Sequence, residues 1–149
     1  MKSRISSFLI ATLLMLQAPW FGTWKLNFAK STGNPDTRFK KVTTQIEPWE
    51  DGLKVTYDAV GSRGGITHLE WSGRFDGRDY PVQGVDYVLT NAYSQIDDHT
   101  YQITIKVDGG VAATARVLIS PDGKTLTTVT TEKNVQNQQV TSTTVYDKQ

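Results

Sequence analysis

The feature that most constrains the fold is a two-residue alternation of apolar and polar side chains, which recurs in short stretches along most of the chain. It is clearest at residues 53–59, LKVTYDA, where every second residue is apolar or aromatic. A period of two is typical of a strand with one buried face. Pairs such as Asp51-Gly52 and Asp108-Gly109 favour tight hairpin turns, because their residues tolerate positive φ. No helical period follows the N-terminal segment.

The alternation predicts about nine or ten short strands joined by short turns. Short turns make successive strands antiparallel neighbours, and closing such a sheet on itself removes its exposed edges. We therefore expect an all-β fold, an up-and-down antiparallel β-barrel of about eight to ten strands, with a two-sheet β-sandwich as the alternative. The strand-like segments are residues 23–28, 39–48, 53–59, 66–75, 80–82, 86–94, 101–107, 111–119, 125–131 and 140–146.

The N-terminus has the pattern of a secretory signal peptide. Lys2 and Arg4 precede an apolar run at 8–16, which is too short to span a bilayer. Ala18 is the best small residue for cleavage, so we expect a signal peptide at 1–20 and one β-barrel domain at 21–149. The alternative is an uncleaved anchor. Cleavage predicts a periplasmic or secreted bacterial protein with no stable membrane span.

Composition excludes several classes of partner and site. The 149 residues include no cysteine, which removes disulfides and zinc–thiolate sites and suits a bacterial periplasm. Without Lys2 and Arg4, the 16 basic residues fall to 14 against 15 acidic ones, a net charge of −1. A near-neutral domain lacks the basic surface that nucleic acid or anionic lipid requires. We expect no nucleic-acid partner.

No constellation of catalytic residues is recognisable. His68 and His99 are the two histidines and lie far apart in the chain, so no metal site is expected, although a haem ligand is a further alternative. The alternation favours the outer face for His68 and a turn for His99. Nucleophile-elbow, phosphate-loop and dinucleotide motifs are absent from the sequence. We therefore expect no cofactor and, most simply, no enzyme.

Motifs at the two ends of the chain resemble those of the calycins, which include lipocalins, fatty-acid-binding proteins and avidins. These are Gly22-Thr-Trp-Lys-Leu, matching the G-x-W first strand, and Val145-Tyr-Asp-Lys, matching a Tyr-Glu/Asp-Lys last strand. The resemblance implies a barrel in which Trp24 is a structural plug at one end. Fatty-acid-binding proteins also carry two lid helices and an Arg-x-Tyr carboxylate site. Here a short loop replaces the helices, and the matching positions are Thr144 and Tyr146.

A nearer resemblance is to small exported bacterial proteins described as lipocalin-like, which have no established activity. It rests on GTWKLN-AKS, FDG-DYPV-G, S-DGKTLT and VYDKQ, at residues 22–31, 75–84, 120–127 and 145–149. This resemblance implies a fold and a compartment, and it implies no ligand.

Two functions are compatible with these observations. The first is a non-catalytic barrel that binds a small apolar or amphipathic ligand inside. The second is a filled barrel that acts as a structural or protein-interaction module through Thr-rich faces at 125–131 and 141–144. Arg116 interrupts the most apolar strand and would grip an anionic head group in one register but face solvent in the other. The ligand-binding residues expected are Tyr57, Trp71, Tyr87, Tyr101, Ile103, Arg116 and Tyr146.

Overall fold

The computed structural model describes residues 18–33 and 39–149, and within them all regular structure is β-strand. Residues 1–17, which hold most of the predicted signal peptide, and residues 34–38 lie outside the described part of the chain. Within that part, no helix is long and apolar enough to cross a membrane. The strands are β1 Gly22–Thr32, β2 Phe39–Trp49, β3 Gly52–Gly61, β4 Ile66–Gly73, β5 Tyr80–Gln83, β6 Leu89–Asp97, β7 Thr100–Val107, β8 Gly110–Ile119, β9 Thr125–Lys133 and β10 Gln139–Lys148.

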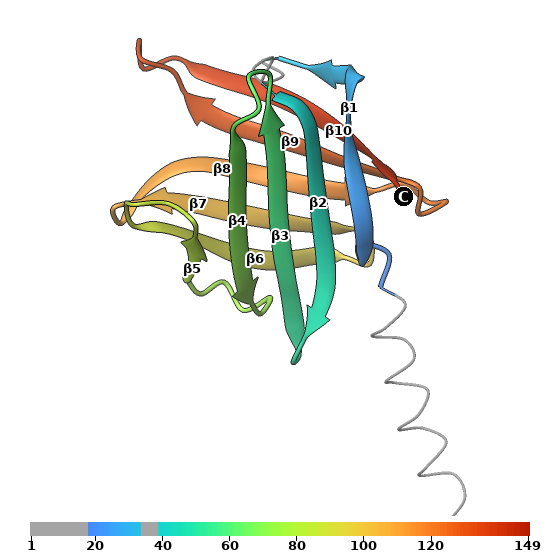
Figure 1. The fold of residues 1–149 in the computed structure, drawn as a ribbon. Helices are drawn as coiled ribbons and strands as arrows, with labels where there is room; N and C mark the ends of the chain where they lie inside the picture. The colour runs from blue at the N-terminus through green and yellow to red at the C-terminus, as the bar shows by residue number, and fades with distance from the viewer. Residues whose placement is uncertain (1–17, 34–38) are drawn as a thin grey trace, which may run out of the picture.

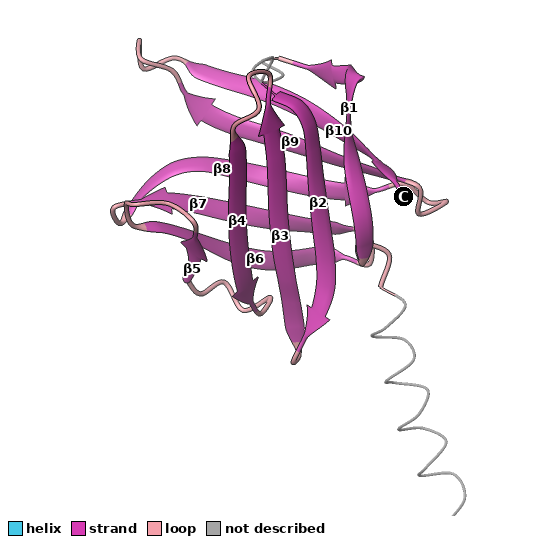
Figure 2. Ribbon diagram, viewed as in Figure 1, coloured by secondary structure: helices cyan, strands magenta, loops and turns pink. Residues whose placement is uncertain are grey.

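The ten strands form one closed antiparallel barrel in which each strand pairs with the next in sequence. The circle closes where β1 pairs with β10, with Trp24 opposite Lys148 and Asn27 opposite Val145. The predicted up-and-down barrel is therefore confirmed, and the sandwich alternative is wrong. Figures 1 and 2 show β2, β3 and β4 crossing in front of β6, β7 and β8, so the barrel resembles two strongly inclined layers.

One predicted hairpin turn is confirmed and another is displaced by one residue. Asp108-Gly109 turns with φ of 50° and 84°, as expected for a primed turn. The turn expected at Asp51-Gly52 lies instead at Glu50-Asp51, and Glu50 takes the positive φ of 48°. Gly52 belongs to β3, where a Cβ atom would lie 2.0 Å from the carbonyl oxygen of Gly73. That close approach, and not the turn, requires the glycine.

The strand expected at 86–94 begins and ends three residues later, as β6. Residues 84–88 form a bend after β5, and Gly84 adopts a φ of 111° there. A Cβ atom on Gly84 would lie 2.2 Å from the carbonyl oxygen of His68, so the bend packs tightly on β4. Sequence analysis did not locate this bend, which depends on the close approach of Gly84 to a distant strand.

A dense aromatic core fills the end of the barrel where the chain enters, which we call the closed end. Trp24 is fully buried there, and its Nε1 donates a hydrogen bond to the carbonyl oxygen of Trp20 at 3.0 Å. Trp20 is 5% exposed and meets Phe75 and Tyr101 edge to face. The sequence analysis placed Trp20 in the leader, whereas its side chain belongs to the core. The buried cluster comprises Trp20, Trp24, Ile46, Leu53, Trp71, Tyr93, Tyr101, Ile103, Ala115, Val117, Ile119 and Leu126.

Towards the opposite end, which we call the mouth, the inner wall becomes polar and less tightly packed. On β9, Leu126 is buried, whereas Thr128 and Thr130 on the same face are half-buried. Their partners on β10, Thr144 and Ser142, are also half-buried. Hydroxyl groups thus line the inner wall towards the mouth, whereas aromatic rings fill the closed end. The two halves of the barrel therefore differ in both polarity and packing.

Candidate ligand-binding site

The weakest closure of the barrel lies at β5, which has only four residues. It pairs with β4 through Glu70 and Trp71, and with β6 through Thr90 and Asn91, two pairs on each side. Pro81 contributes no backbone N–H to either ladder. By contrast, β3 and β4 share eight pairs. We call this short closure the seam.

A pocket of about 190 Å³ lies behind the seam, and we call it the seam pocket. Three aliphatic side chains from three strands, two aromatic rings and three polar or hydroxyl-bearing side chains line it. The lining residues are Val55, Tyr57, Leu69, Glu70, Trp71, Val82, Asn91 and Tyr93.

The indole of Trp71 is held rigidly at the seam pocket. Its Nε1 donates to the carbonyl oxygens of Tyr80 and Asn91, both at 3.1 Å. Its ring stacks on Tyr93 with centroids 4.0 Å apart and an interplanar angle of 15°. A Cβ atom on Gly73 would lie 2.6 Å from this indole, so the glycine makes room for it. These contacts consume the donor of Trp71 and preform the aromatic side of the pocket.

Asn91 lines the seam pocket and carries a buried, unmatched acceptor. Its Oδ1 is buried and receives no hydrogen bond from the described residues. A buried polar atom without a partner costs roughly 1–3 kcal/mol, so native proteins rarely leave one. Sequence analysis missed Asn91, although one signal was present: it is a polar residue on the same strand face as Leu89 and Tyr93.

A second polar group of the interior involves Tyr57, Tyr146 and Thr44. Tyr146 on β10 packs on the buried cluster of Leu26, Val42 and Ala59, as does Tyr57 on β3. Burial, followed by the neighbouring Tyr57, raises the pKa of Tyr146 to about 12, although its hydrogen bond with Thr44 opposes the shift. Tyr146 is therefore a neutral phenol at physiological pH.

The predicted site residues divide into three groups. Trp71 and Tyr57 line the seam pocket, and Tyr146 lies beside Tyr57. Tyr101 and Ile103 are inward-facing but packed in the closed-end core, with 2% and 9% of their surface exposed. Burial raises the pKa of Tyr101 well above its ordinary value. These two residues belong to the closed-end core and do not line the seam pocket.

Tyr87 and Arg116 do not belong to the interior. Tyr87 lies in the bend before β6 and is 49% exposed. Arg116 alternates with the buried Ala115 and Val117 on β8 and is exposed on the outer face. The register that would turn Arg116 inward is therefore wrong, because the small apolar residues take the inner face. No lysine or arginine lines the seam pocket.

The histidines lie where the alternation predicted. His68 is on the outer face, with Nδ1 2.5 Å from Asp58 and Nε2 3.1 Å from Glu70. His99 lies in the turn between β6 and β7. Over residues 18–33 and 39–149, no group of three or more side chains has the arrangement of a metal site.

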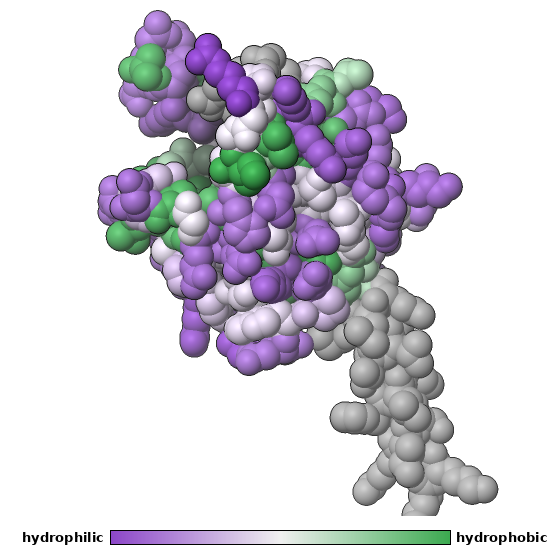
Figure 3. All heavy atoms as spheres, viewed as in Figure 1, coloured by the Kyte–Doolittle hydropathy of each residue, from purple (hydrophilic) through white to green (hydrophobic). Residues whose placement is uncertain are grey.

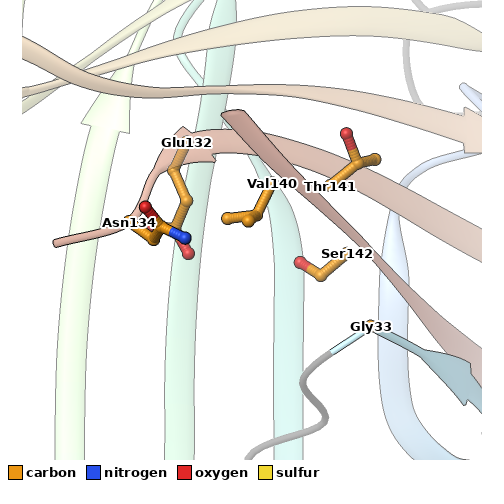
Figure 4. A pocket seen from close by; sticks show the side chains of 6 residues that line it. All are labelled: Gly33, Glu132, Asn134, Val140, Thr141 and Ser142. Carbon is orange, nitrogen blue, oxygen red and sulfur yellow. The ribbon is translucent and has the colours of Figure 1, made fainter. Parts of the chain in front are cut away.

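A larger pocket of about 450 Å³ lies at the mouth, where the β9–β10 hairpin passes Gly33 (Figure 4). The figure shows Val140, Thr141 and Ser142 on β10, Glu132 and Asn134 on the other arm of the hairpin, and Gly33 at the end of β1. The side chain of Asn134 is engaged by its own turn, since its Oδ1 accepts from the backbone N–H groups of residues 136 and 138. Among the described residues, no aromatic ring lines this pocket. The seam pocket is therefore the stronger candidate, despite its smaller volume.

The molecular surface offers no comparable alternative on the face drawn in Figure 3. That face is mostly hydrophilic, with apolar side chains in separate small groups. Several exposed apolar side chains are near the mouth, among them Ile66, Val88 and Val111. Scattered exposed apolar residues are normal in soluble proteins.

Comparisons with known proteins inform the fold. No family model and no curated protein matches this chain. Among solved structures, the zebrafish ileal bile acid-binding protein complexed with cholic acid superposes with a TM-score of 0.57 at 15% identity, over 88% of this chain and 99% of that one. The siderocalin Ex-FABP gives a TM-score of 0.40 at 13% identity, over 88% and 71%. The first match, together with the closed ten-strand topology, shows that this chain shares the barrel fold of that protein, which is the type of barrel that the terminal motifs predicted.

Proposed function

We propose that this calycin-type barrel binds one small apolar or amphipathic molecule in the seam pocket. The observation that carries the proposal is the pocket itself: a preformed, mostly apolar recess behind the least-paired part of the barrel wall. Ligand sites are typically concave and apolar, with a few placed polar groups. Its volume of about 190 Å³ is below the ~300–1,000 Å³ typical of sites for drug-sized ligands, which favours a small ligand.

The seam offers a route into this pocket. Opening it requires the loss of only the short ladders of β5, whereas opening β3 from β4 would break eight residue pairs. Local openings of low free energy occur where few backbone hydrogen bonds and few buried contacts hold a segment. The rigid Trp71 stack remains in place behind β5, so entry of a ligand does not require the core to rearrange.

The structural comparison supports this proposal at the level of architecture. A barrel of the same fold has been crystallised with cholic acid. At 15% identity that likeness does not carry over the ligand, and the wall described above has its own chemistry.

A pocket-filling variant tests the proposal. Leu69 lines the seam pocket, so Leu69→Trp should fill it and reduce binding of the apolar dye N-phenyl-1-naphthylamine at least tenfold. The matched control is Leu118→Trp on the outer face, where Leu118 is 38% exposed, and it should leave binding unchanged. Equal dye affinity in both variants would place the binding elsewhere. If the wild-type protein bound no dye and carried no bound mass in native mass spectrometry, a filled structural or interaction module would be the better description.

We also propose that the protein is exported to the periplasm or the exterior and loses its leader. Because Trp20 is buried and accepts the hydrogen bond of Trp24, processing must leave Trp20 attached to the barrel. Cleavage is therefore expected at or before Ala18, and not after residue 20. The intact mass of the exported protein tests this, and a mature chain beginning at Phe21 would refute it.

A further inference from the structure

The most exposed apolar side chains of the barrel follow a pattern. Four large apolar side chains exceed all others in the described part of the chain, and each is ordinary when taken alone. They are Ile66 at 78% exposure, Val88 at 62%, Val111 at 63% and Val135 at 103%. One lies at or beside each of four connections, β3–β4, β5–β6, β7–β8 and β9–β10. We call these four side chains the mouth tips.

The four connections that carry the mouth tips lie at the same end of the barrel. Because each strand reverses the direction of the one before it, alternate connections of an up-and-down barrel share an end. Figure 1 shows these four on its upper and left sides, whereas the connections of the closed end lie on its lower and right sides. The backbone N–H of Asp108 donates to the carbonyl oxygen of Val88 at 2.8 Å, which ties two of the four together. The mouth tips therefore border the mouth.

The two ends of the barrel differ in charge as well. The four closed-end connections include seven acidic and three basic residues, a net charge of −4, and comprise residues 50–51, 74–79, 97–99 and 120–124. The four connections at the mouth include two acidic and two basic residues, a net charge of zero, and comprise residues 61–66, 84–88, 107–111 and 133–140. Only the mouth can therefore approach an apolar phase without bringing an excess of charge to it.

Separate apolar tips suit a lipid surface better than a protein partner. A stable protein interface has a closely packed apolar core, whereas the mouth tips stand on four different connections with polar residues and glycines between them. The interface of a fluid bilayer accepts each side chain independently, and binding strengthens with the apolar area inserted. A net charge of zero at the mouth favours a zwitterionic lipid over an anionic one, and the acidic closed end would turn away from an anionic surface.

We propose that the barrel docks mouth-first on a zwitterionic lipid surface, with the mouth tips inserted into the interface. A groove of about 350 Å³ beside one tip, Val111, is also lined by Glu132 and Lys133, which offer opposite charges to a zwitterionic headgroup. Docking is peripheral and reversible, and it goes beyond the binding of a small ligand. It does not depend on the seam pocket, so it is measured on protein without any ligand.

A matched pair of isoleucine variants tests the docking by flotation with phosphatidylcholine vesicles. The protein used is the exported chain, with its mass confirming that the leader has been removed. Ile66→Ser removes a mouth tip and should lower the partition onto vesicles about tenfold, as expected from losing one buried isoleucine. Ile96→Ser is the control, because Ile96 is 48% exposed near the closed end, and it should leave partition unchanged. Circular dichroism verifies that both variants are folded. Equal losses in the two variants would overturn the orientation, and a wild-type protein that does not float would overturn the docking.

A fluorescent label gives a second readout that does not depend on removing a tip. The sequence has no cysteine, so Val135→Cys at the mouth and Asp122→Cys at the closed end each provide one labelling site. With a nitrobenzoxadiazole label, emission should rise on addition of phosphatidylcholine vesicles at residue 135 and stay unchanged at residue 122. A rise at residue 122 alone would overturn the orientation.

Two further outcomes separate lipid docking from other uses of the mouth. Vesicles that contain phosphatidylglycerol should bind the protein no more tightly than phosphatidylcholine alone. Binding that requires the anionic lipid and disappears at high salt would overturn docking through apolar insertion. A wild-type protein that ignores vesicles but forms a dimer, which Ile66→Ser makes monomeric, would replace the lipid surface with a second copy of this chain.

Discussion

Removal of the Trp20 side chain should destabilise the barrel severely. Trp20 is 5% exposed and packs on Phe75 and Tyr101 at the closed end, with ring centroids 5.4 and 5.6 Å away. Its carbonyl oxygen also fixes the indole of Trp24. The perturbation is Trp20→Ala, which removes the ring but keeps the carbonyl and its hydrogen bond. The loss of stability then measures the packing of the ring, less the relief from removing the Trp20 Nε1 donor, which is buried without a partner among the described residues.

The magnitude follows from the buried area. A tryptophan buries up to about 250 Å², so at ~25 cal/mol per Å² its transfer is worth about 6 kcal/mol, an upper estimate because unfolded chains bury some of this area. Measured Trp→Ala changes in cores cost about 3–5 kcal/mol. We expect a loss in that range, which is a large part of a typical total of about 5–15 kcal/mol. The midpoint of thermal unfolding should fall by about 10–15 °C.

The assay is thermal and urea unfolding of protein that lacks the leader, followed by far-ultraviolet circular dichroism. Val135→Ala is the control, because Val135 is fully exposed in the β9–β10 turn, and it should change the free energy of unfolding by less than about 0.5 kcal/mol. A shortened chain that begins at Phe21 should lose more than Trp20→Ala, because it also removes the acceptor of Trp24. A midpoint for Trp20→Ala within about 2 °C of the wild type would refute the placement of this ring in the core.

Three further predictions concern other parts of the barrel. Gly52→Ala should lower the free energy of unfolding, measured with urea, by about 3 kcal/mol, because the new Cβ would lie 2.0 Å from the carbonyl oxygen of Gly73. An unchanged midpoint of urea unfolding would contradict that contact. Hydrogen bonds with Asp58 and then Glu70 raise the pKa of His68 above 6.5, so its stabilising effect should be complete below pH 6.5 and disappear as pH rises through the raised pKa. An NMR titration gives this pKa, and His68→Gln should flatten the corresponding pH dependence of the unfolding midpoint. Amide hydrogens of β5 should exchange faster than those of β3, because β5 has two residue pairs on each side, and equal protection would argue against the seam as a route of entry.

Local pattern was sufficient for most of the secondary structure. The alternation in β3 and the Asp108-Gly109 turn depend on a residue and its immediate neighbours, and both were predicted correctly. The displaced turn at Glu50-Asp51 and the later start of β6 were not predicted from the sequence. Both depend on glycines whose missing side chains admit a distant carbonyl: Gly52 against β4 and Gly84 against β4. Such approaches between strands have no signal in a single segment.

Local sequence predicts only in part whether a side chain faces the inside or the outside of the barrel wall. Arg116 and His68 could be assigned once the apolar neighbours were given the inner face, because side chains in a strand alternate strictly. Their outer positions follow from that rule. Local sequence does not indicate whether an inward-facing ring lines a pocket or packs in the core. Trp71 and Tyr101 are both inward-facing, yet only Trp71 borders the seam pocket.

The sequence by itself determined the antiparallel pairing of successive strands, since short turns and a two-residue period leave few alternatives. The structure decided between a closed barrel and a sandwich, because closure depends on the pairing of β1 with β10. Tertiary structure alone decided where the barrel is filled and where it is hollow, because packing depends on which side chains meet across the interior. It packed Trp20, which sequence analysis assigned to the leader, against Phe75 and Tyr101 from distant strands, and it left the seam pocket behind β5.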